Sequence, residues 1–324
     1  MATSSANLEM VGQVDPSRDT VNALVSAIRS GDDVACQTQI ASLLMLERSV
    51  MANALWASND LASCINEAIV TGSSTAVLKW AFDLVACKER SLTDFVMQFV
   101  PALSWIFLLK HQSPTPSTGA GIVLMALCKT ASSSGTFEDR FSLENALPDM
   151  SIPSIYHKPV AGDKAAPLTA NLLRAHDLRH TSKPSGEVDP TAVFDASAVG
   201  SLQLVRTALA RFIATVSRLP AMAVANYCIL SARLCGAVPS DVPSEAAIGW
   251  DARIGDCTLS IESFATADLE LVLVRGLAHA VTVDSCRSVA EFALRALHDK
   301  ATRNLSQSVL LATSGLIESI HHDI

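Results

Sequence analysis

The stretch SLTDFVMQFVPALSWIFLL, residues 91–109, decides the fold of this chain. Its apolar residues recur every three or four positions through the first two turns, which is the period of one helix face. After Pro101 apolar residues occupy the opposite side as well, so this part must be covered all round. A mid-helix proline removes one donor and clashes with the preceding turn, so we expect a kink or break there. We predict a buried central helix with Ser91 as its N-cap and Asp94 in a capping-box position.

The composition of the chain favours packed helices. Of its 324 residues 49% are hydrophobic, 17% are charged and 5% are aromatic, a mixture that excludes a disordered chain or a coiled coil. The net charge is −8 and no basic cluster stands out, so direct binding to nucleic acid or to an anionic bilayer is not indicated. The central stretch is too short for a membrane span, which needs about 18 or more apolar residues.

The eight cysteines and the amino terminus indicate a reducing compartment. The closest two cysteines lie seven residues apart, so the chain has no zinc or redox spacing and we expect scattered, buried thiols. The first ten residues, MATSSANLEM, lack the basic and apolar blocks of a secretory signal. We therefore expect a cytoplasmic protein.

The pattern of short apolar helices joined by short polar turns predicts an all-α fold. We expect an irregular, solenoid-like helical bundle. We expect a disordered tail at residues 1–16 and an N-terminal helical half at 17–181 that includes a proline-rich irregular segment. In the 136–160 region, where prolines are frequent and helical periodicity is weak, we allow for one short strand pair. The sequence SKPSGEVDP at 182–190 is a flexible linker. It leads to a C-terminal helical half at 191–320, and we predict that both halves pack into one body.

Glycines and capping residues set the expected helix boundaries. In the N-terminal half one helix ends at Gly31, and the next is capped by Asp32 or Asp33 and runs on towards Trp56. Another ends near Gly72, and Ser73 or Ser74 opens the helix that follows. The remaining helices are expected at 122–128, before an ASSSG loop at 131–135, and at 192–219, 221–235, 262–282, 285–298 and 303–320.

A search for catalytic motifs leaves one candidate. Walker, Gly-x-Gly-x-x-Gly, Gly-x-Ser-x-Gly and His-Glu-x-x-His patterns are all absent. In His176-Asp177-Leu178-Arg179-His180 two histidines at i,i+4 can share a helix face and bind a metal. HD-type metal-dependent phosphohydrolases carry such a His-Asp pair, but residues 176–190 lead directly into the linker. We expect no catalytic, metal or cofactor site, and keep the phosphohydrolase that uses His176, Asp177 and His180 as the alternative.

Three stretches resemble the helical region of the hyccin family. They are QFVPALSWIFLL at 98–109, IPSIYHKP at 152–159 and LTANLLRAHDL at 168–178, and the resemblance covers about residues 75–320. The most specific string is Pro-Ser-Ile-Tyr-His-x-Pro. The resemblance makes the following residues candidates for a structural role or for contact with a partner: Pro153, Ser154, Tyr156, His157, Pro159, Trp105 and Phe107. A tyrosine and a histidine between prolines usually lock an irregular segment through backbone hydrogen bonds.

The resemblance to the hyccin family implies a scaffold and not an enzyme. It implies a subunit of the phosphatidylinositol 4-kinase type III alpha complex that supports phosphatidylinositol 4-phosphate production at the plasma membrane. Its expected direct partner is a tetratricopeptide-repeat adaptor, while a lipid-anchored scaffold protein holds the assembly to the bilayer. The chain itself would then reach the plasma membrane only through its partners. A helical adaptor in vesicle traffic is a further alternative that the residues leave open.

Overall fold

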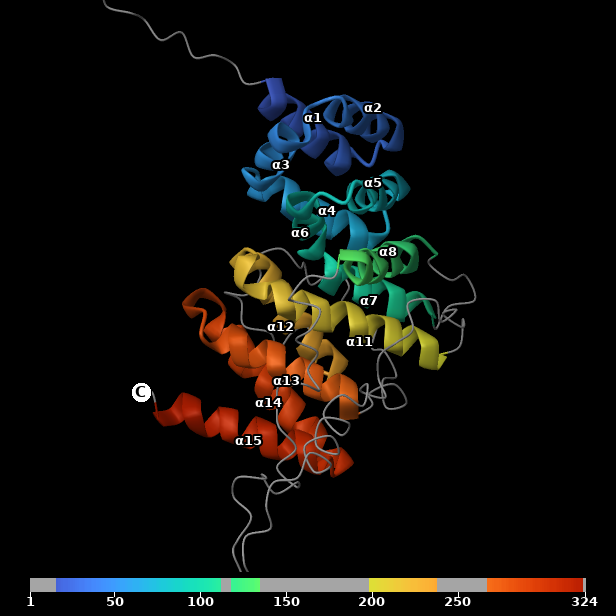
Figure 1. The fold of residues 1–324 in the computed structure, drawn as a ribbon. Coiled ribbons are helices and arrows are strands. Elements are labelled where there is room, and N and C mark those ends of the chain that lie inside the picture. The colour runs from blue at the N-terminus through green and yellow to red at the C-terminus, as the bar shows by residue number, and fades with distance from the viewer. Residues whose placement is uncertain (1–15, 112–117, 135–197, 238–266, 323–324) are drawn as a thin grey trace, which may run out of the picture. The chain divides into compact units, whose positions relative to one another are not determined.

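The computed structural model describes residues 16–111, 118–134, 198–237 and 267–322. All regular structure in these ranges is helical, and they contain no strand (Figure 1). The all-α class and the helical bundle are therefore confirmed, whereas the solenoid-like arrangement stays a prediction. The tail, the strand pair at 136–160 and the linker at 182–190 lie outside the described residues, so these boundaries also stay predictions.

The chain divides into two compact units, one of residues 1–130 and 194–324 and one of residues 131–193. The first unit contains almost all described helices. Its N-terminal helices are α1 (Pro16–Ser30), α2 (Asp33–Leu44), α3 (Arg48–Trp56), α4 (Asn59–Thr71) and α5 (Thr75–Ala86). The expected ends at Gly31 and Gly72 are confirmed, because both glycines adopt a positive φ, +70° and +65°, that favours glycine. The caps at Asp32 and Ser74 are confirmed as well, since each side chain accepts a backbone N–H of its helix.

One expected helix in this region is wrong. The sequence predicted a single helix from residue 33 towards Trp56, but α2 ends at Leu44 and α3 begins at Arg48. Neither glycine nor proline marks this break. Since α3 packs against α1 and α6, tertiary contacts set the break, and local sequence preferences do not.

The central stretch forms two helices, α6 (Arg90–Met97) and α7 (Val100–His111), which are bent by 51° relative to each other. The break at Pro101 is confirmed. The proline lies in the first turn of α7, where a backbone N–H would have no acceptor within the helix, so its absence breaks no hydrogen bond. All residues from 100 to 106 are buried, so the all-round cover is confirmed for these residues, whereas Phe107 and Leu109 are half-buried. The N-cap prediction at Ser91 is wrong, because Glu89 occupies that position without a side-chain cap.

The next helices are α8 (Thr118–Ser134), α11 (Ala198–Thr215) and α12 (Ala221–Leu234), with a 3-10 turn, η2 (Val216–Arg218), between the last two. The break at Pro220 is confirmed, since this proline is the N-cap of α12. The expected loop at 131–135 is wrong in large part, because α8 continues through Ser134. From Ala223 onward every residue of α12 is buried.

The last helices are α13 (Ala267–Val281), α14 (Arg287–Asn304) and α15 (Gln307–His322), with a 3-10 turn, η7 (Asp284–Cys286), before α14. The expected end of α14 near residue 298 is wrong, because the helix closes at Leu305, which takes a left-handed φ of +54°. The expected i,i+4 pair of Glu291 and Arg295 is present at 4.0 Å.

Helix α7 joins the two halves of the first unit. It packs against α4 from the N-terminal half and against α11 and α12 from the C-terminal half (Figure 1). Helix α12 in turn contacts α13 and α14, and α15 covers both of these. No single described helix is long and apolar enough to cross a membrane, although the bent pairs α4–α5 and α6–α7 pass that test when each pair is taken together.

Candidate interaction site

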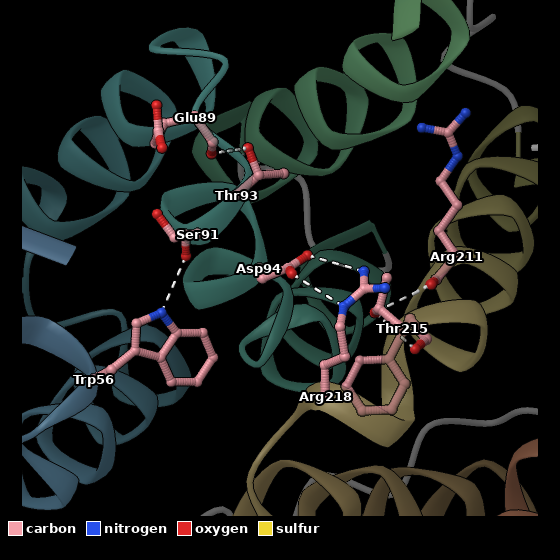
Figure 2. Close-up of polar contacts among 9 residues, drawn as sticks. Trp56, Glu89, Ser91, Thr93, Asp94, Arg211, Thr215 and Arg218 are labelled. Atoms are coloured by element: carbon pink, nitrogen blue, oxygen red, sulfur yellow. Dashed lines mark hydrogen bonds and ion pairs between the residues drawn. The ribbon is translucent and has the colours of Figure 1, made fainter. Parts of the chain in front are cut away.

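An aromatic cluster connects α3, α5 and α6. Phe95 of α6 lies 5.7 Å from the ring of Trp56, 6.5 Å from Trp80 and 5.4 Å from Phe99, measured between centroids. The indole Nε1 of Trp56 donates to the backbone oxygen of Ser91 at 3.1 Å (Figure 2). Edge-to-face rings at these distances add to the energy of burial, so α3, α5 and α6 form one rigid group.

A bidentate ion pair links this group to the C-terminal half. Nε and Nη2 of Arg218 donate to the two carboxylate oxygens of Asp94 at 3.1 and 3.3 Å (Figure 2). The sequence placed Asp94 in a capping box, and the structure instead pairs its carboxylate with η2. Both side chains keep some exposure to water, 33% for Arg218 and 16% for Asp94, so we expect a contribution of at most about 1 kcal/mol to stability.

Trp105 and Phe107, the candidate residues on α7, differ in burial. Trp105 is 2% exposed, and the guanidinium of Arg233 lies 5.2 Å above its ring, which is within cation–π distance. Phe107 is half-buried. A Cβ at Gly121 of α8 would lie 2.8 Å from the Phe107 ring, so glycine at this position leaves room for the ring. Trp105 therefore belongs to the core, while part of Phe107 stays accessible.

The other sequence candidates lie outside the described residues. This holds for Pro153, Ser154, Tyr156, His157 and Pro159, and for His176, Asp177 and His180. Their roles stay predictions. The described residues contain no group of three His, Cys, Asp or Glu side chains that could hold a metal ion. Another His-Asp dipeptide, His298-Asp299, lies in α14, and there Nδ1 of His298 lies 2.9 Å from Oγ1 of Thr313, which ties α14 to α15.

A buried ion pair joins three helices of the C-terminal half. Lys300 of α14 and Glu270 of α13 are 3.8 Å apart, and their side chains are only 9% and 3% exposed. The Lys300 ammonium also donates to the backbone oxygen of Leu234 at the end of α12, at 2.9 Å. Burial raises the pKa of Glu270, and the charge of Lys300 opposes this shift. This arrangement holds the end of α12 against α13 and α14.

The seven described cysteines form no disulfide bond. Six of these seven are buried, and Cys87 is half-exposed. Burial raises the pKa of the Cys235 thiol to about 12 and that of the Cys128 thiol to about 11. Because the thiolate is the reactive form, these side chains behave as small apolar groups.

Four of the eight large apolar side chains that are exposed among the described residues lie at α2, the turn after it and α3. Large apolar residues that are exposed among the described residues are Val34, Leu44, Met45, Val50, Phe82, Ile122, Leu305 and Leu311. We call the first four, from α2, the turn after it and α3, the α2–α3 patch. Sequence reasoning missed this patch, although one signal was present: residues 34–45 contain no charged side chain.

Comparison with known proteins identifies the family. No curated protein matches the chain. The model of the hyccin family matches residues 47–324, which include α3 and every described helix after it. Helices α1 and α2, and with them three of the four side chains of the α2–α3 patch, precede the matched residues. Since the match spans nearly the whole sequence, this chain belongs to the hyccin family.

Proposed function

We propose that this chain is a non-catalytic scaffold subunit that stabilises a phosphatidylinositol 4-kinase type III alpha complex. The observation that carries the proposal is the family match over residues 47–324. In this role the chain promotes phosphatidylinositol 4-phosphate production without acting on the lipid itself. The absence of any motif for phosphoryl transfer or hydrolysis in the sequence supports this role.

The direct partner in this proposal is a tetratricopeptide-repeat adaptor. Recruitment to the plasma membrane then depends on the adaptor, the kinase and a lipid-anchored scaffold protein. The charge of the chain supports an indirect route: an excess of eight acidic charges opposes direct attachment to an anionic leaflet. We accordingly place the protein in the cytoplasm, at the inner side of the plasma membrane.

Co-expression tests this proposal directly. The full chain is produced alone and together with the tetratricopeptide-repeat adaptor of its source organism, and both samples are followed by size-exclusion chromatography with light scattering. We expect a stable heteromeric complex with a higher melting temperature than the lone chain, because binding to the folded state stabilises it. A lone chain that stays monomeric in the presence of the adaptor, with an unchanged melting temperature, would refute the proposal.

No observation favours the phosphohydrolase or the vesicle-traffic adaptor over this function. The residues that the phosphohydrolase requires, His176, Asp177 and His180, lie outside the described part of the chain. Bound metal at one equivalent per chain that is lost in His176→Ala would support that alternative, and the purified protein can be tested for it by elemental analysis.

A further inference from the structure

We propose that Arg275, on α13, binds an acidic side chain of the tetratricopeptide-repeat adaptor; this inference rests on the proposed function. Arg275 is half-buried, and among the described residues its guanidinium has no hydrogen bond, ion pair or ring contact. Every other described arginine or lysine that is not exposed does have such a partner, namely Arg206, Arg211, Arg233, Arg287 and Lys300. The lack of a partner therefore distinguishes Arg275 from the other half-buried and buried cations of the described residues.

A half-buried guanidinium without a partner is unfavourable for the folded chain. Arginine stays protonated at neutral pH, and burial lowers the pKa of Arg275 because it disfavours the charged form. Removal of a charged group from water costs free energy unless a carboxylate or another polar group compensates for it. A side chain that costs stability and forms no bond within the fold is typical of a residue kept for function.

The acidic residues of α13 do not supply the missing anion. The helix has two of them, Asp268 and Glu270. The carboxylate of Asp268 pairs with Arg206 of α11 at 3.2 Å, and that of Glu270 faces Lys300 of α14 at 3.8 Å. The guanidinium of Arg275 is therefore left for an anion of a second molecule. Residue 275 also lies within residues 47–324, which match the hyccin family and on which the proposed function rests.

The surroundings of Arg275 favour the carboxylate of a protein over the phosphate of a lipid. Its neighbours at i−4, i+3 and i+4 are Leu271, Ala278 and His279, all half-buried and none of them acidic. An anionic bilayer is normally bound by several clustered cations, whereas Arg275 is a single guanidinium in a chain of net charge −8. One guanidinium matches one carboxylate, because its planar fork donates two parallel hydrogen bonds. Leu271 and Ala278 can exclude water from this contact, and an arginine within such a ring is a frequent centre of protein interfaces.

Substitutions of Arg275 in the full chain test the inference, with matched substitutions of Arg295 as controls. Arg295 of α14 is 63% exposed and lies 4.0 Å from Glu291, and such a surface pair contributes little. The affinity of each variant for the adaptor is measured by isothermal titration calorimetry. We expect Arg275→Met to weaken binding about tenfold or more. Arg275→Glu should weaken it further, because two carboxylates then face each other. Arg295→Met and Arg295→Glu change the charge equally and should bind as the wild type does.

The melting temperature of the lone chain separates a binding role from a structural one. Arg275→Met removes an unpaired charge and breaks no bond within the fold, and methionine can replace the packing of the arginine stem. We therefore expect this variant to melt at the wild-type temperature or above it. A lower melting temperature would show that Arg275 supports the fold, and it would overturn the inference.

The remaining outcomes separate failure of the inference from failure of the proposed function. If the wild type binds the adaptor and Arg275→Met binds equally well, the inference is wrong while the proposed function stands. Equal affinities of Arg275→Met and Arg275→Glu would show that no carboxylate faces this position, and equal losses in the Arg295 variants would show a non-specific effect of charge. A wild type that does not bind the adaptor refutes the proposed function, and the inference with it. Vesicles of phosphatidylcholine and phosphatidylserine are the second probe: sedimentation of the lone chain with them that Arg275→Met abolishes would make a lipid phosphate the anion and overturn the inference.

Discussion

Replacing Lys300 by methionine removes the ammonium group that faces Glu270 inside the fold. The two side chains are 9% and 3% exposed and 3.8 Å apart, which is too long for a hydrogen bond and short enough for an ion pair. Methionine keeps most of the volume of the lysine stem, so the substitution creates no large cavity. Its main effect is to leave a buried carboxylate without its cation and the carbonyl of Leu234 without its 2.9 Å donor.

The expected loss follows from these two contacts. Breaking a buried ion pair by removal of one partner typically costs 3–5 kcal/mol. Since this pair lacks a direct hydrogen bond, we expect the lower end, about 3 kcal/mol, of which about 1 kcal/mol belongs to the bond with Leu234. At roughly 2–4 °C per kcal/mol for a chain of this size class, the melting temperature should fall by about 6–12 °C.

Urea unfolding followed by circular dichroism measures this loss. Lys79→Met is the matched control, because Lys79 is exposed on α5 and should change stability by less than about 0.5 kcal/mol. Adding Glu270→Gln to Lys300→Met should recover about 2 kcal/mol, since the uncompensated charge is then gone. A loss below about 1 kcal/mol in Lys300→Met, or no recovery in the double variant, would refute the reasoning.

The pH dependence of the same variant gives an independent check. Burial raises the folded-state pKa of Glu270 above the ordinary value of 4.5, and the loss of Lys300 should raise it further. A raised carboxyl pKa means that the folded state binds more protons than the unfolded state, so stability falls as pH increases from 4.5 through the folded-state pKa. The difference between wild type and Lys300→Met should therefore be larger at pH 7 than at pH 4.5, and a difference that is independent of pH would contradict this account.

Two further predictions concern close packing and thiol reactivity. Gly276→Ala should destabilise the chain by about 1–3 kcal/mol or more, because its Cβ would lie 2.3 Å from the buried ring of Tyr227. Gly315→Ala, with open space around it, should instead stabilise α15 by up to about 1 kcal/mol, and urea unfolding that ranks the two alike would contradict this. In native protein a disulfide reagent should modify half-exposed Cys87 first and leave Cys235, which is buried with a pKa of about 12, unmodified until unfolding. Equal rates for these two thiols would refute the buried position of Cys235.

Sequence reasoning succeeded where one residue fixes the local backbone. Gly31 and Gly72 end helices because the chain turns through a left-handed conformation there. Pro101 lies in the first turn of α7 and Pro220 is the N-cap of α12, because proline is tolerated at the start of a helix and not in its interior. Such positions act through their own geometry, so no knowledge of distant contacts is required.

Sequence reasoning failed where contacts between residues far apart in the chain determine the local structure. The break between Leu44 and Arg48 has no local signal and follows from the packing of α3 on α1 and α6. The pair of Glu270 and Lys300 joins residues thirty positions apart, and a charge pattern in one helix cannot reveal it. In α2 the inward side was not apparent from the sequence, because Asp33 at its first residue is the only charged side chain of this helix.

The apolar content of this chain is not in itself an argument for docking. Half of the residues are hydrophobic, but α7 is buried all round from residue 100 to 106 and α12 from Ala223 onward, and these helices take up much of that content. The apolar part of a docking surface must therefore consist of the few large apolar side chains that remain exposed. Four of the eight such side chains among the described residues lie at α2, the turn after it and α3, and the other four are spread over α5, α8, α14 and α15. Variants at each of these positions therefore separate a surface that binds a partner from a core that only holds the fold.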